Sequence, residues 1–327
     1  MSMMRLLVTC GHLQRNIERY RADIEATGVE LVVPPLTAQQ FSASDMKKFI
    51  ADVDTVIAGD DIIDGEVLAV GKANRLKAVI KWGIGTDSID KDAARRLGLP
   101  VYNTPGAFSD EVADLALGLL LALVRHIPQI DAKIRDGAWP RYEGTSLTGK
   151  TVGIVGLGGI GRAIAVRCKA FGMSVTGSDV MVLPEAEAKA LSLSQRSLED
   201  ILAVSDIIIL ACNLTAENRH MIDEAALRRV KPGAVLVNVA RGPLVDEQAL
   251  IAALRSGHLG GAALDVFETE PLPENSPLRE FPNCIFGSHG GSSTAEAIDR
   301  INRLTIEIAR NVLNIGASDP SRYNRVA

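Results

Sequence analysis

The sequence predicts an α/β protein with two domains, each built on a doubly wound parallel sheet. Apolar strand-like runs alternate with amphipathic segments along nearly all of the 327 residues, a pattern typical of parallel sheets covered by helices. A glycine-rich turn follows an apolar run that starts at residue 151, so about 100 residues precede the unit that such a turn begins. The chain is long enough for two hydrophobic cores. We therefore expect a separate α/β domain before the glycine turn.

The first domain is expected to contain five short strands with helices between them. These strands are Arg5–Cys10, Val29–Val33, Thr55–Gly59, Leu76–Lys81 and Pro100–Asn103, with helical patterns such as Gln14–Ala26 and Ser44–Ala51. The second domain is expected to contain six strands, namely Thr151–Val155, Ser174–Ser178, Asp206–Ala211, Ala234–Asn238, Gly261–Leu264 and Cys284–Phe286. Six strands match the strand count of a complete doubly wound nucleotide-binding unit.

Two helical segments are expected to connect the domains. The helix Asp110–Arg125, continued through Asp136, carries the chain into the second domain, and the amphipathic segment Thr294–Leu313 crosses back to complete the first. The predicted domains are residues 1–103 with 293–327, and residues 104–292. The apolar run 115–124 has about half the length of a membrane span, so it is buried in a core or at a subunit interface.

The composition indicates a globular protein. Hydrophobic residues make up 47% and charged residues 23%, and a net charge of −5 does not favour binding to nucleic acid or to a membrane surface. The four cysteines lack paired spacing, which argues against a metal site or a disulfide framework and favours a reducing cytoplasm. The apolar run near the N-terminus is too short for a signal peptide.

The segment Thr151–Gly161 carries the spacing of a dinucleotide-binding turn. Gly156 allows a tight turn, Gly158 lets the backbone approach a pyrophosphate, and Gly161 lets the following helix pack on the strand. Gly159 and Ile160 form the first turn of that helix, whose N-terminus faces the phosphates. Asp179 lies 18 residues beyond Gly161, where it accepts hydrogen bonds from ribose hydroxyls and repels a 2′-phosphate. The pattern predicts an NAD site.

Polar residues that could perform chemistry follow three successive predicted strands. Arg241 suits bidentate binding of a carboxylate, and His289 suits proton transfer near neutral pH. Glu270 is the expected partner of His289, favouring its protonated form, with Glu268 as a rival. Asp265 lies at a strand end and suits the nicotinamide carboxamide. The remaining histidines lack a partner pattern and are interpreted as structural or solvated: His12, His126, His220 and His258.

Taken in order, these motifs resemble those of the D-isomer-specific 2-hydroxyacid dehydrogenase family. The resemblance rests on the Gly-Leu-Gly-x-Ile-Gly turn, Asn-Val-Ala-Arg-Gly, Asp-Val-Phe-x-x-Glu-Pro and Ser-His-x-Gly, and extends to Asn103–Gly106 and Gly83–Asp90. It implies a flavodoxin-like substrate domain and a Rossmann NAD domain around a cleft, and a homodimer formed through the cofactor domain.

The same resemblance implies roles for individual residues. Arg241 binds the substrate carboxylate and carbonyl, His289 is the acid/base, and Glu270 is its partner. Backbone amides around Ile84 and Gly85 bind the carboxylate. The positions expected around the dinucleotide are Ser109, Cys212, Thr215, Ala240 and Asp265. The implied activity is interconversion of a D-2-hydroxy acid and its 2-oxo acid with NAD and without a metal.

The sequence departs from the family pattern at a few positions. Asn213 and Ser288 replace prolines that are common there. Relatives acting on 3-phosphoglycerate carry an arginine near residues 58–61, where this chain has Asp60 and Asp61, which repel a phosphate unless Lys81 or Arg141 compensates. D-3-phosphoglycerate dehydrogenase activity therefore stays an alternative, as does an NAD(H)-sensing corepressor-like protein. Formate-type oxidation is disfavoured by Glu270, because relatives with that activity have glutamine there.

Overall fold

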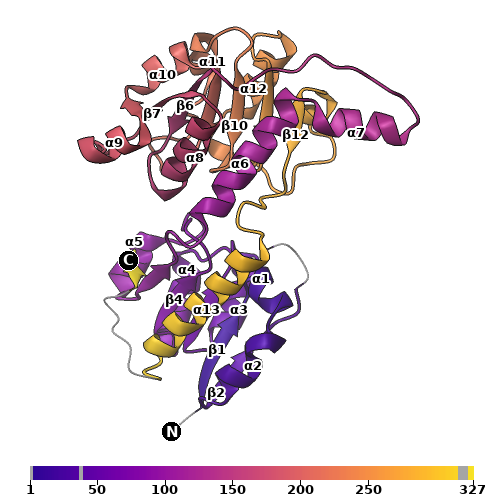
Figure 1. Ribbon diagram of the computed structural model, residues 1–327. Helices are drawn as coiled ribbons and strands as arrows, with labels where there is room; N and C mark the ends of the chain where they lie inside the picture. Colours follow the sequence, from indigo (N-terminus) through magenta and orange to yellow (C-terminus); the bar gives the residue numbers. More distant parts are fainter. Residues whose placement is uncertain (1–2, 37–39, 316–322) are drawn as a thin grey trace. The chain divides into compact units, whose positions relative to one another are not determined.

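The computed structural model describes residues 3–36, 40–315 and 323–327, and the chain forms two compact units (Figure 1). Unit 1 comprises Met1–Ala107 and Thr294–Ala327, and unit 2 comprises Phe108–Ser293. The first boundary lies four residues later than the sequence predicted, and the second lies one residue later. Both fall next to a helix N-terminus, since α6 begins at Ser109 and α13 at Ala295.

Unit 1 is built on a six-stranded sheet with the order β13-β5-β4-β3-β1-β2. Its strands are β1 (Met4–Val8), β2 (Val29–Val32), β3 (Thr55–Ala58), β4 (Ala78–Lys81), β5 (Val101–Asn103) and β13 (Asn324–Arg325). The five expected strands are parallel and in the flavodoxin-like order 2-1-3-4-5. The sixth, β13, was not predicted. It pairs antiparallel with β5 and is two residues long, too short to leave a periodic signal.

The helices of unit 1 are α1 (Gly11–Arg15), α2 (Glu18–Glu25), α3 (Ala43–Ile50), α4 (Gly65–Ala73), α5 (Lys91–Leu97) and α13 (Ala295–Val312). The single helix expected over Gln14–Ala26 is wrong, because the chain breaks at Asn16 and Ile17. Helix α13 packs on β3 and β4, while α3, α4 and α5 pack in sequence against one another (Figure 1). The Thr294 side chain accepts the N–H of Ala297, which caps α13.

Unit 2 is built on a seven-stranded parallel sheet with the order β12-β11-β10-β9-β6-β7-β8. Its strands are β6 (Thr151–Val155), β7 (Ser174–Ser178), β8 (Leu193–Gln195), β9 (Ile207–Leu210), β10 (Val235–Asn238), β11 (Gly261–Leu264) and β12 (Cys284–Phe286). Counted within the unit, the order is 3-2-1-4-5-6-7, which is the Rossmann order with one further strand. The prediction of six strands is wrong, since it missed the three-residue strand β8.

The helices of unit 2 are α6 (Ser109–Val124), α7 (Ile127–Arg135), α8 (Gly159–Ala170), α9 (Glu185–Leu191), α10 (Leu198–Val204), α11 (Glu224–Arg229) and α12 (Glu247–Arg255), with 3-10 turns η1 (Gly242–Leu244) and η2 (Pro277–Glu280). Helix α6 packs on α8 and on β10, β11 and β12, and α10, α11 and α12 pack in sequence (Figure 1). Much of the apolar run 115–124 is buried in this unit, so it belongs to a core.

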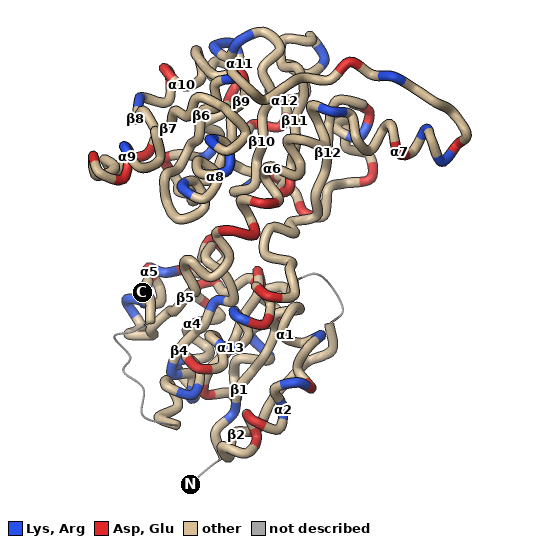
Figure 2. Tube along the Cα trace, viewed as in Figure 1, with Lys and Arg blue, Asp and Glu red and all other residues tan. Residues whose placement is uncertain are grey.

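The long helix expected to continue through Asp136 is interrupted. His126 adopts a left-handed backbone conformation with φ of 54°, which ends α6 and starts α7 in a new direction. Among the described residues, no single helix is long and apolar enough to cross a membrane. Helices α6 and α7 together reach that length and apolar composition, but the pair is bent by 62°. Acidic and basic residues are interspersed along both units (Figure 2).

Candidate active site

The glycine turn between β6 and α8 depends on glycine at two positions. Gly156 has φ of 98°, and a Cβ atom there would lie 2.6 Å from the Cys212 nitrogen. A Cβ atom on Gly161 would lie 1.9 Å from the carbonyl oxygen of Gly156, so only glycine lets α8 begin this close to the strand. Around Gly158, by contrast, a Cβ atom would meet no described atom within 4 Å. The turn therefore has the open backbone that a pyrophosphate requires.

Asp179 lies directly after β7 with its carboxylate on the glycine turn. Its Oδ2 atom accepts the N–H of Leu157 at 2.6 Å, and its Oδ1 atom accepts the N–H of Met181 at 2.9 Å. The Gln195 side chain supports the same loop, accepting from Leu183 and donating to the carbonyl oxygens of Asp179 and Met181. The acid predicted to face a ribose is thus held beside the predicted phosphate-binding turn.

Two other expected cofactor residues contact the glycine turn. Ser109 opens α6, and its hydroxyl oxygen would lie 2.7 Å from a Cβ atom on Gly159. Cys212 packs on Gly156, and burial, together with the charge of Asp179, raises the pKa of its thiol to about 11. Cys212 is therefore a neutral packing group at neutral pH rather than a nucleophile.

Three further cofactor positions lie after β9, after β10 and in α8. Thr215 is exposed in the loop after β9, where its N–H donates to the Asn218 side chain at 2.7 Å. Ala240 is buried after β10. Ile160 is half-buried in the first turn of α8. Arg162, in the same turn of α8, donates from Nε to the carbonyl oxygen of Leu157 at 2.8 Å and forms an ion pair with Glu187.

Arg241 is positioned by a turn that Asn238 closes. The Asn238 side chain accepts the N–H of Ala240 at 3.0 Å and donates to the carbonyl oxygen of Arg241 at 2.9 Å. A Cβ atom on Gly242 would lie 1.9 Å from the carbonyl carbon of Phe267, so glycine lets this turn lie against the loop after β11. Asn238 is the last residue of β10, and its role could have been inferred only from the Asn-x-Ala-Arg-Gly spacing.

His289 and Glu270 form a hydrogen-bonded pair. The distance between His289 Nδ1 and Glu270 Oε2 is 2.7 Å, and the Oε1 atom of Glu270 accepts the N–H of Phe267 at 2.9 Å. Because a carboxylate only accepts, Nδ1 carries the hydrogen and Nε2 is the ring nitrogen that can exchange a proton with a substrate. Of the two acids considered, Glu270 is the one that contacts His289.

Glu268 has a different partner. Its Oε1 atom is hydrogen-bonded to Nε2 of His220, and the guanidinium of Arg219 lies 3.5 Å away. His220 thus has a structural partner that no sequence pattern indicated. The residues are 48 positions apart in the sequence, so no local pattern could have paired them. Of the other histidines, His12 stacks on Trp82 and His126 contacts the carbonyl oxygen of Glu143.

Asp265 holds the loop that carries His289. Its carboxylate accepts the N–H groups of Gly290 and Gly291, each at 3.0 Å, and its carbonyl oxygen accepts the N–H of His289 at 2.7 Å. Burial raises the pKa of Asp265 above the usual value, although these N–H groups oppose the shift. His289 itself has a left-handed backbone with φ of 56°. Asp265 thus anchors the loop, a role that the sequence did not indicate.

In unit 1, the loop around Ile84 and Gly85 follows β4 and is held by the chain after it. Asn103 donates to the carbonyl oxygen of Ile84 at 2.7 Å. Thr104 accepts the N–H of Gly83 through its hydroxyl and donates its own N–H to the Gly83 carbonyl oxygen. The Asn103–Gly106 motif therefore shapes the loop whose amides are expected to bind a carboxylate.

Lys81 and the two acids near residue 60 also lie at strand ends of unit 1. The buried Lys81 ammonium donates to Asp60 at 2.9 Å and to the Trp82 carbonyl oxygen at 3.1 Å. Asp61 is buried and accepts from the hydroxyl of Thr9 and from the N–H groups of Phe41 and Gly59. Lys81 is thus already neutralised by Asp60.

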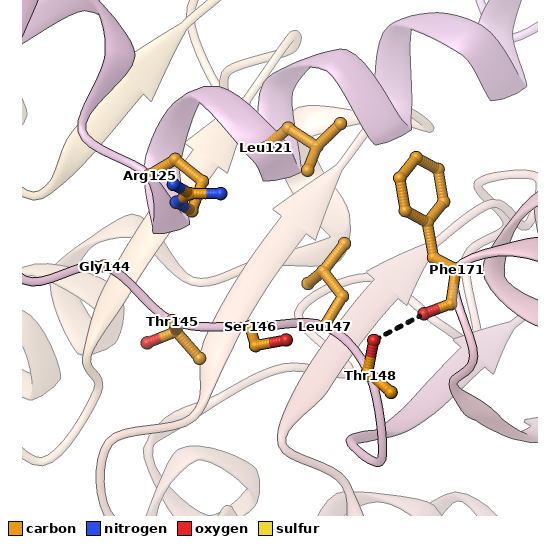
Figure 3. Close-up of a pocket in the computed structure, with 8 residues that line it drawn as sticks. All are labelled: Leu121, Arg125, Gly144, Thr145, Ser146, Leu147, Thr148 and Phe171. Carbon is orange, nitrogen blue, oxygen red and sulfur yellow. Dashed lines mark hydrogen bonds between the residues drawn. The ribbon is translucent and has the colours of Figure 1, made fainter.

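A hollow of about 390 Å³ opens on unit 2 at the C-terminal end of α6 (Figure 3). Its apolar part is surrounded by Leu121, Leu147 and Phe171, and its polar part includes Arg125 and Thr148. None of its lining residues is a predicted catalytic or cofactor residue. The hollow is therefore considered separately from the site at the strand ends.

The fold and these strand-end groups define a class of protein. The sheet has the Rossmann order, with a glycine turn after its first strand and an acid after its second. An arginine and a histidine–glutamate pair follow later strands. This combination is typical of a nicotinamide-dependent dehydrogenase. Residues 117–291 match the NAD-binding domain of D-isomer specific 2-hydroxyacid dehydrogenases. The chain belongs to the D-isomer-specific 2-hydroxyacid dehydrogenase family and carries its NAD-binding domain.

Individual relatives support this membership. The chain is 45% identical over 253 residues to D-3-phosphoglycerate dehydrogenase of Mycobacterium bovis, covering 77% of this chain and 47% of that protein. It therefore spans about half the length of that relative. It is 42% identical over 288 residues to glyoxylate reductase of Pyrococcus furiosus, covering 84% of each. The crystal structure of a glyoxylate reductase from Paecilomyes thermophila matches with a TM-score of 0.85 at 30% identity, over 100% of this chain and 99% of that one.

Proposed function

We propose that this protein interconverts a small D-2-hydroxy acid and its 2-oxo acid with NAD. The observation that carries the proposal is the hydrogen bond between His289 and Glu270, formed in the loops after β11 and β12 of the sheet that holds the glycine turn. Arg241 follows β10, the next strand of that sheet. Ligands of doubly wound sheets bind at these strand ends, which supports a common site for the three residues.

Each residue has a defined task in the reduction. When bound, NADH supplies the hydride that adds to the carbonyl carbon. Arg241 binds the carboxylate and polarises the carbonyl, as its planar guanidinium allows. His289 delivers a proton from Nε2 to the carbonyl oxygen, and Glu270 offsets the positive charge of the protonated ring. The proton and the hydride together convert the ketone into the alcohol, and the reverse steps oxidise it.

The residues of unit 1 favour substrates without a phosphate. We assign the amides around Ile84 and Gly85 to the substrate carboxylate. The ammonium of Lys81, which donates to Asp60, would lie 3.9 Å from a Cβ atom on the neighbouring Gly83. Since Asp60 already pairs with Lys81, the buried carboxylate of Asp61 leaves this group of charges negative. A dianionic phosphate is repelled there. The group on the far side of the carbonyl is a hydrogen in glyoxylate and a hydroxymethyl group in hydroxypyruvate, and neither carries a charge. D-3-phosphoglycerate dehydrogenase activity is the second candidate, favoured by the 45% identity to enzymes of that name.

One screen tests the proposal and separates its alternatives. NADH oxidation is measured with glyoxylate, hydroxypyruvate, pyruvate and phosphohydroxypyruvate. We expect turnover with one or more of the first three and a lower kcat/KM for the phosphorylated compound. A higher kcat/KM for phosphohydroxypyruvate would support the phosphoglycerate dehydrogenase candidate instead. Tight NADH binding without any turnover would contradict catalysis and favour a sensor.

We also propose that the protein is a homodimer joined through unit 2. Helix α7 has no buried residue, yet it carries the apolar Ile127 and Ile134, and the segment after it exposes 78% of Trp139. Exposed apolar side chains within one segment, here residues 127–139 (the arm), favour an interface. A two-fold axis lets the arm of each copy use the same surface on the other. The hollow beside Leu121 and Phe171 is the surface we assign to the second copy (Figure 3).

The cellular compartment is a separate proposal. The four cysteines are all free, and three of them, Cys10, Cys168 and Cys284, are buried. Burial raises the pKa of Cys10 to about 12, so that thiol stays protonated and unreactive. Free thiols of this kind suit a reducing compartment, and we propose the cytoplasm.

A further inference from the structure

A second histidine–glutamate pair lies next to the pair formed by His289 and Glu270. Nε2 of His220 is hydrogen-bonded to Oε1 of Glu268, and both side chains are partly buried, with exposed fractions of 35% and 24%. Glu268 and Glu270 are separated only by Thr269. The second pair is therefore attached to the same loop as the partner of the proposed acid/base.

The backbone around His220 is bonded to the turn that carries Arg241. His220 has a left-handed conformation with φ of 55°, and its N–H donates to the carbonyl oxygen of Pro243 at 2.8 Å. Two residues later, Ile222 donates to the carbonyl oxygen of Leu244 at 3.0 Å and forms a parallel bridge with Val245. The loop after β9 is thereby fixed to the segment that begins immediately after Arg241.

The turn after Arg241 also contacts the backbone of Glu268. A Cβ atom on Gly242 would lie 1.9 Å from the Phe267 carbonyl and 2.5 Å from the Glu268 nitrogen. The N–H of Glu268 donates to Glu247 of α12 at 2.7 Å. The loops after β9, β10 and β11 therefore meet at Glu268. Its side chain is bound by His220 of the loop after β9, and its N–H is bound by Glu247 of α12.

The charges at this junction need compensation. Burial, together with the charges of Glu268 and Glu270, raises the pKa of Glu247 above its usual value, as expected where acidic groups crowd. Facing Glu268 from the loop after β9 are Arg219 and His220. His289 is faced by Glu270 and Asp265. His220 thus donates a hydrogen bond that holds Glu268 in place beside Glu247 and Glu270.

We propose that His220 is a positioning residue that, through Glu268, fixes the Arg241 turn against the Glu270 loop. The inference rests on the proposed function, because it assigns His220 an effect on the reaction performed by Arg241 and His289. Without the bond to His220, the side chain of Glu268 would turn away from the acids around it. The loop after β9 and the loop after β11 would then lose the hydrogen bond that joins them. Errors of about 1 Å in the placement of reacting groups cost on the order of 10²-fold in rate.

The test compares four variants with the wild-type protein: His220→Ala, His220→Gln, Glu268→Gln and the double variant H220A/E268Q. His258→Ala is the matched control, because His258 precedes β11 and lies at the opposite end of that strand from Glu268. For each protein, kcat and KM are measured with the best substrate of the screen, the NADH Kd by fluorescence titration, and Tm by thermal unfolding.

We expect His220→Ala to lower kcat by at least about fivefold with the NADH Kd within about twofold of wild type. Glutamine at position 220 can still donate to Glu268, so His220→Gln is expected to recover part of kcat. The double variant is expected to be no slower than the slower single variant, since both changes remove one interaction. His258→Ala is expected to keep wild-type kinetics.

The pH profile separates positioning from general stability. Glu268→Gln removes a negative charge two residues from Glu270, the partner of His289, so we expect the alkaline limb of ketone reduction to move to lower pH. His220→Gln keeps that charge and is expected to leave the limb in place. Wild-type kcat in His220→Ala together with an unmoved limb in Glu268→Gln, or additive losses in the double variant, would overturn the role of His220 alone. A wild-type protein without turnover would instead overturn the proposed function.

Discussion

Nδ1 of His289 lies 2.7 Å from Oε2 of Glu270, while the second oxygen of Glu270 is bound by the N–H of Phe267. The carboxylate is therefore held by the backbone on one side and orients the imidazole on the other. Asp265 fixes the same histidine through its main chain. Ring and carboxylate are thus both placed before any substrate arrives, as a preorganised acid/base requires.

Glu270→Gln is expected to slow ketone reduction by at least about tenfold and to move the alkaline limb of its pH profile to lower pH. The glutamine keeps the shape of the side chain but removes the charge that favours the protonated imidazole. The measurement is kcat/KM for the 2-oxo acid between pH 5 and about pH 10. Glu280→Gln, at the exposed end of η2, is the control. An unmoved profile would show that another group acts with His289.

Arg241→Ala is expected to lose roughly 10²-fold or more in kcat/KM while NADH still binds. Arg241→Lys keeps the charge but loses the planar pair of donors, so we expect only partial recovery. Substrate kinetics and an NADH titration together check this, with Arg255→Ala on the exposed side of α12 as the control. Normal turnover in Arg241→Ala would refute the assigned mechanism.

The protein is expected to prefer NADH to NADPH by about tenfold or more in kcat/KM. Asp179 would place a negative charge beside the 2′-phosphate of NADPH. Asp179→Asn can still accept the N–H of Leu157, so it should reduce the preference without destroying the turn. The comparison of kcat/KM for the two cofactors decides the point. Equal values in the wild-type protein would mean that Asp179 does not face the ribose.

Asp54 is expected to make unit 1 more stable at neutral than at acidic pH. Burial alone would raise the pKa of Asp54, but the N–H of Arg5 and the cations of Arg75 and Lys77 hold it below the usual 3.8. Because the pKa is lowered in the folded state, this stabilisation is present above about pH 4 and is lost as the pH falls through the lowered value.

Asp54→Asn should therefore reduce the free energy of unfolding by about 1–3 kcal/mol at pH 7. The difference from wild type should shrink below the usual pKa of 3.8. Thermal or urea unfolding over this pH range provides the measurement, with the exposed Asp92→Asn as the control. A difference that is constant with pH would show that the charge of Asp54 contributes nothing.

The proposed dimer is expected to dissociate when the arm around α7 is made polar. Ile134→Asp and Trp139→Ala remove exposed apolar surface, and a charge at position 134 is costly to bury in an interface. The molar mass from light scattering is compared with that of Lys133→Glu, which changes a polar residue of the same helix. A monomeric wild-type protein, or dimeric variants, would speak against this surface as the interface.

The sequence by itself determined the class of fold and the positions of the chemical groups. Each buried parallel strand leaves a short apolar run, and the glycines of the Thr151–Gly161 turn have spacings that few other structures require. Arg241 and His289 could be placed at strand ends because they follow such runs directly. These signals are local, which is why they can be read without coordinates.

Only the tertiary structure decided which side chains meet. Glu268 and Glu270 differ by two positions in one irregular loop, yet one acid contacts His220 and the other contacts His289. The break at His126 and the strands β8 and β13 likewise depend on backbone geometry or on very short pairings. Contacts between distant segments leave no periodic trace, because they are selected by packing and charge in three dimensions.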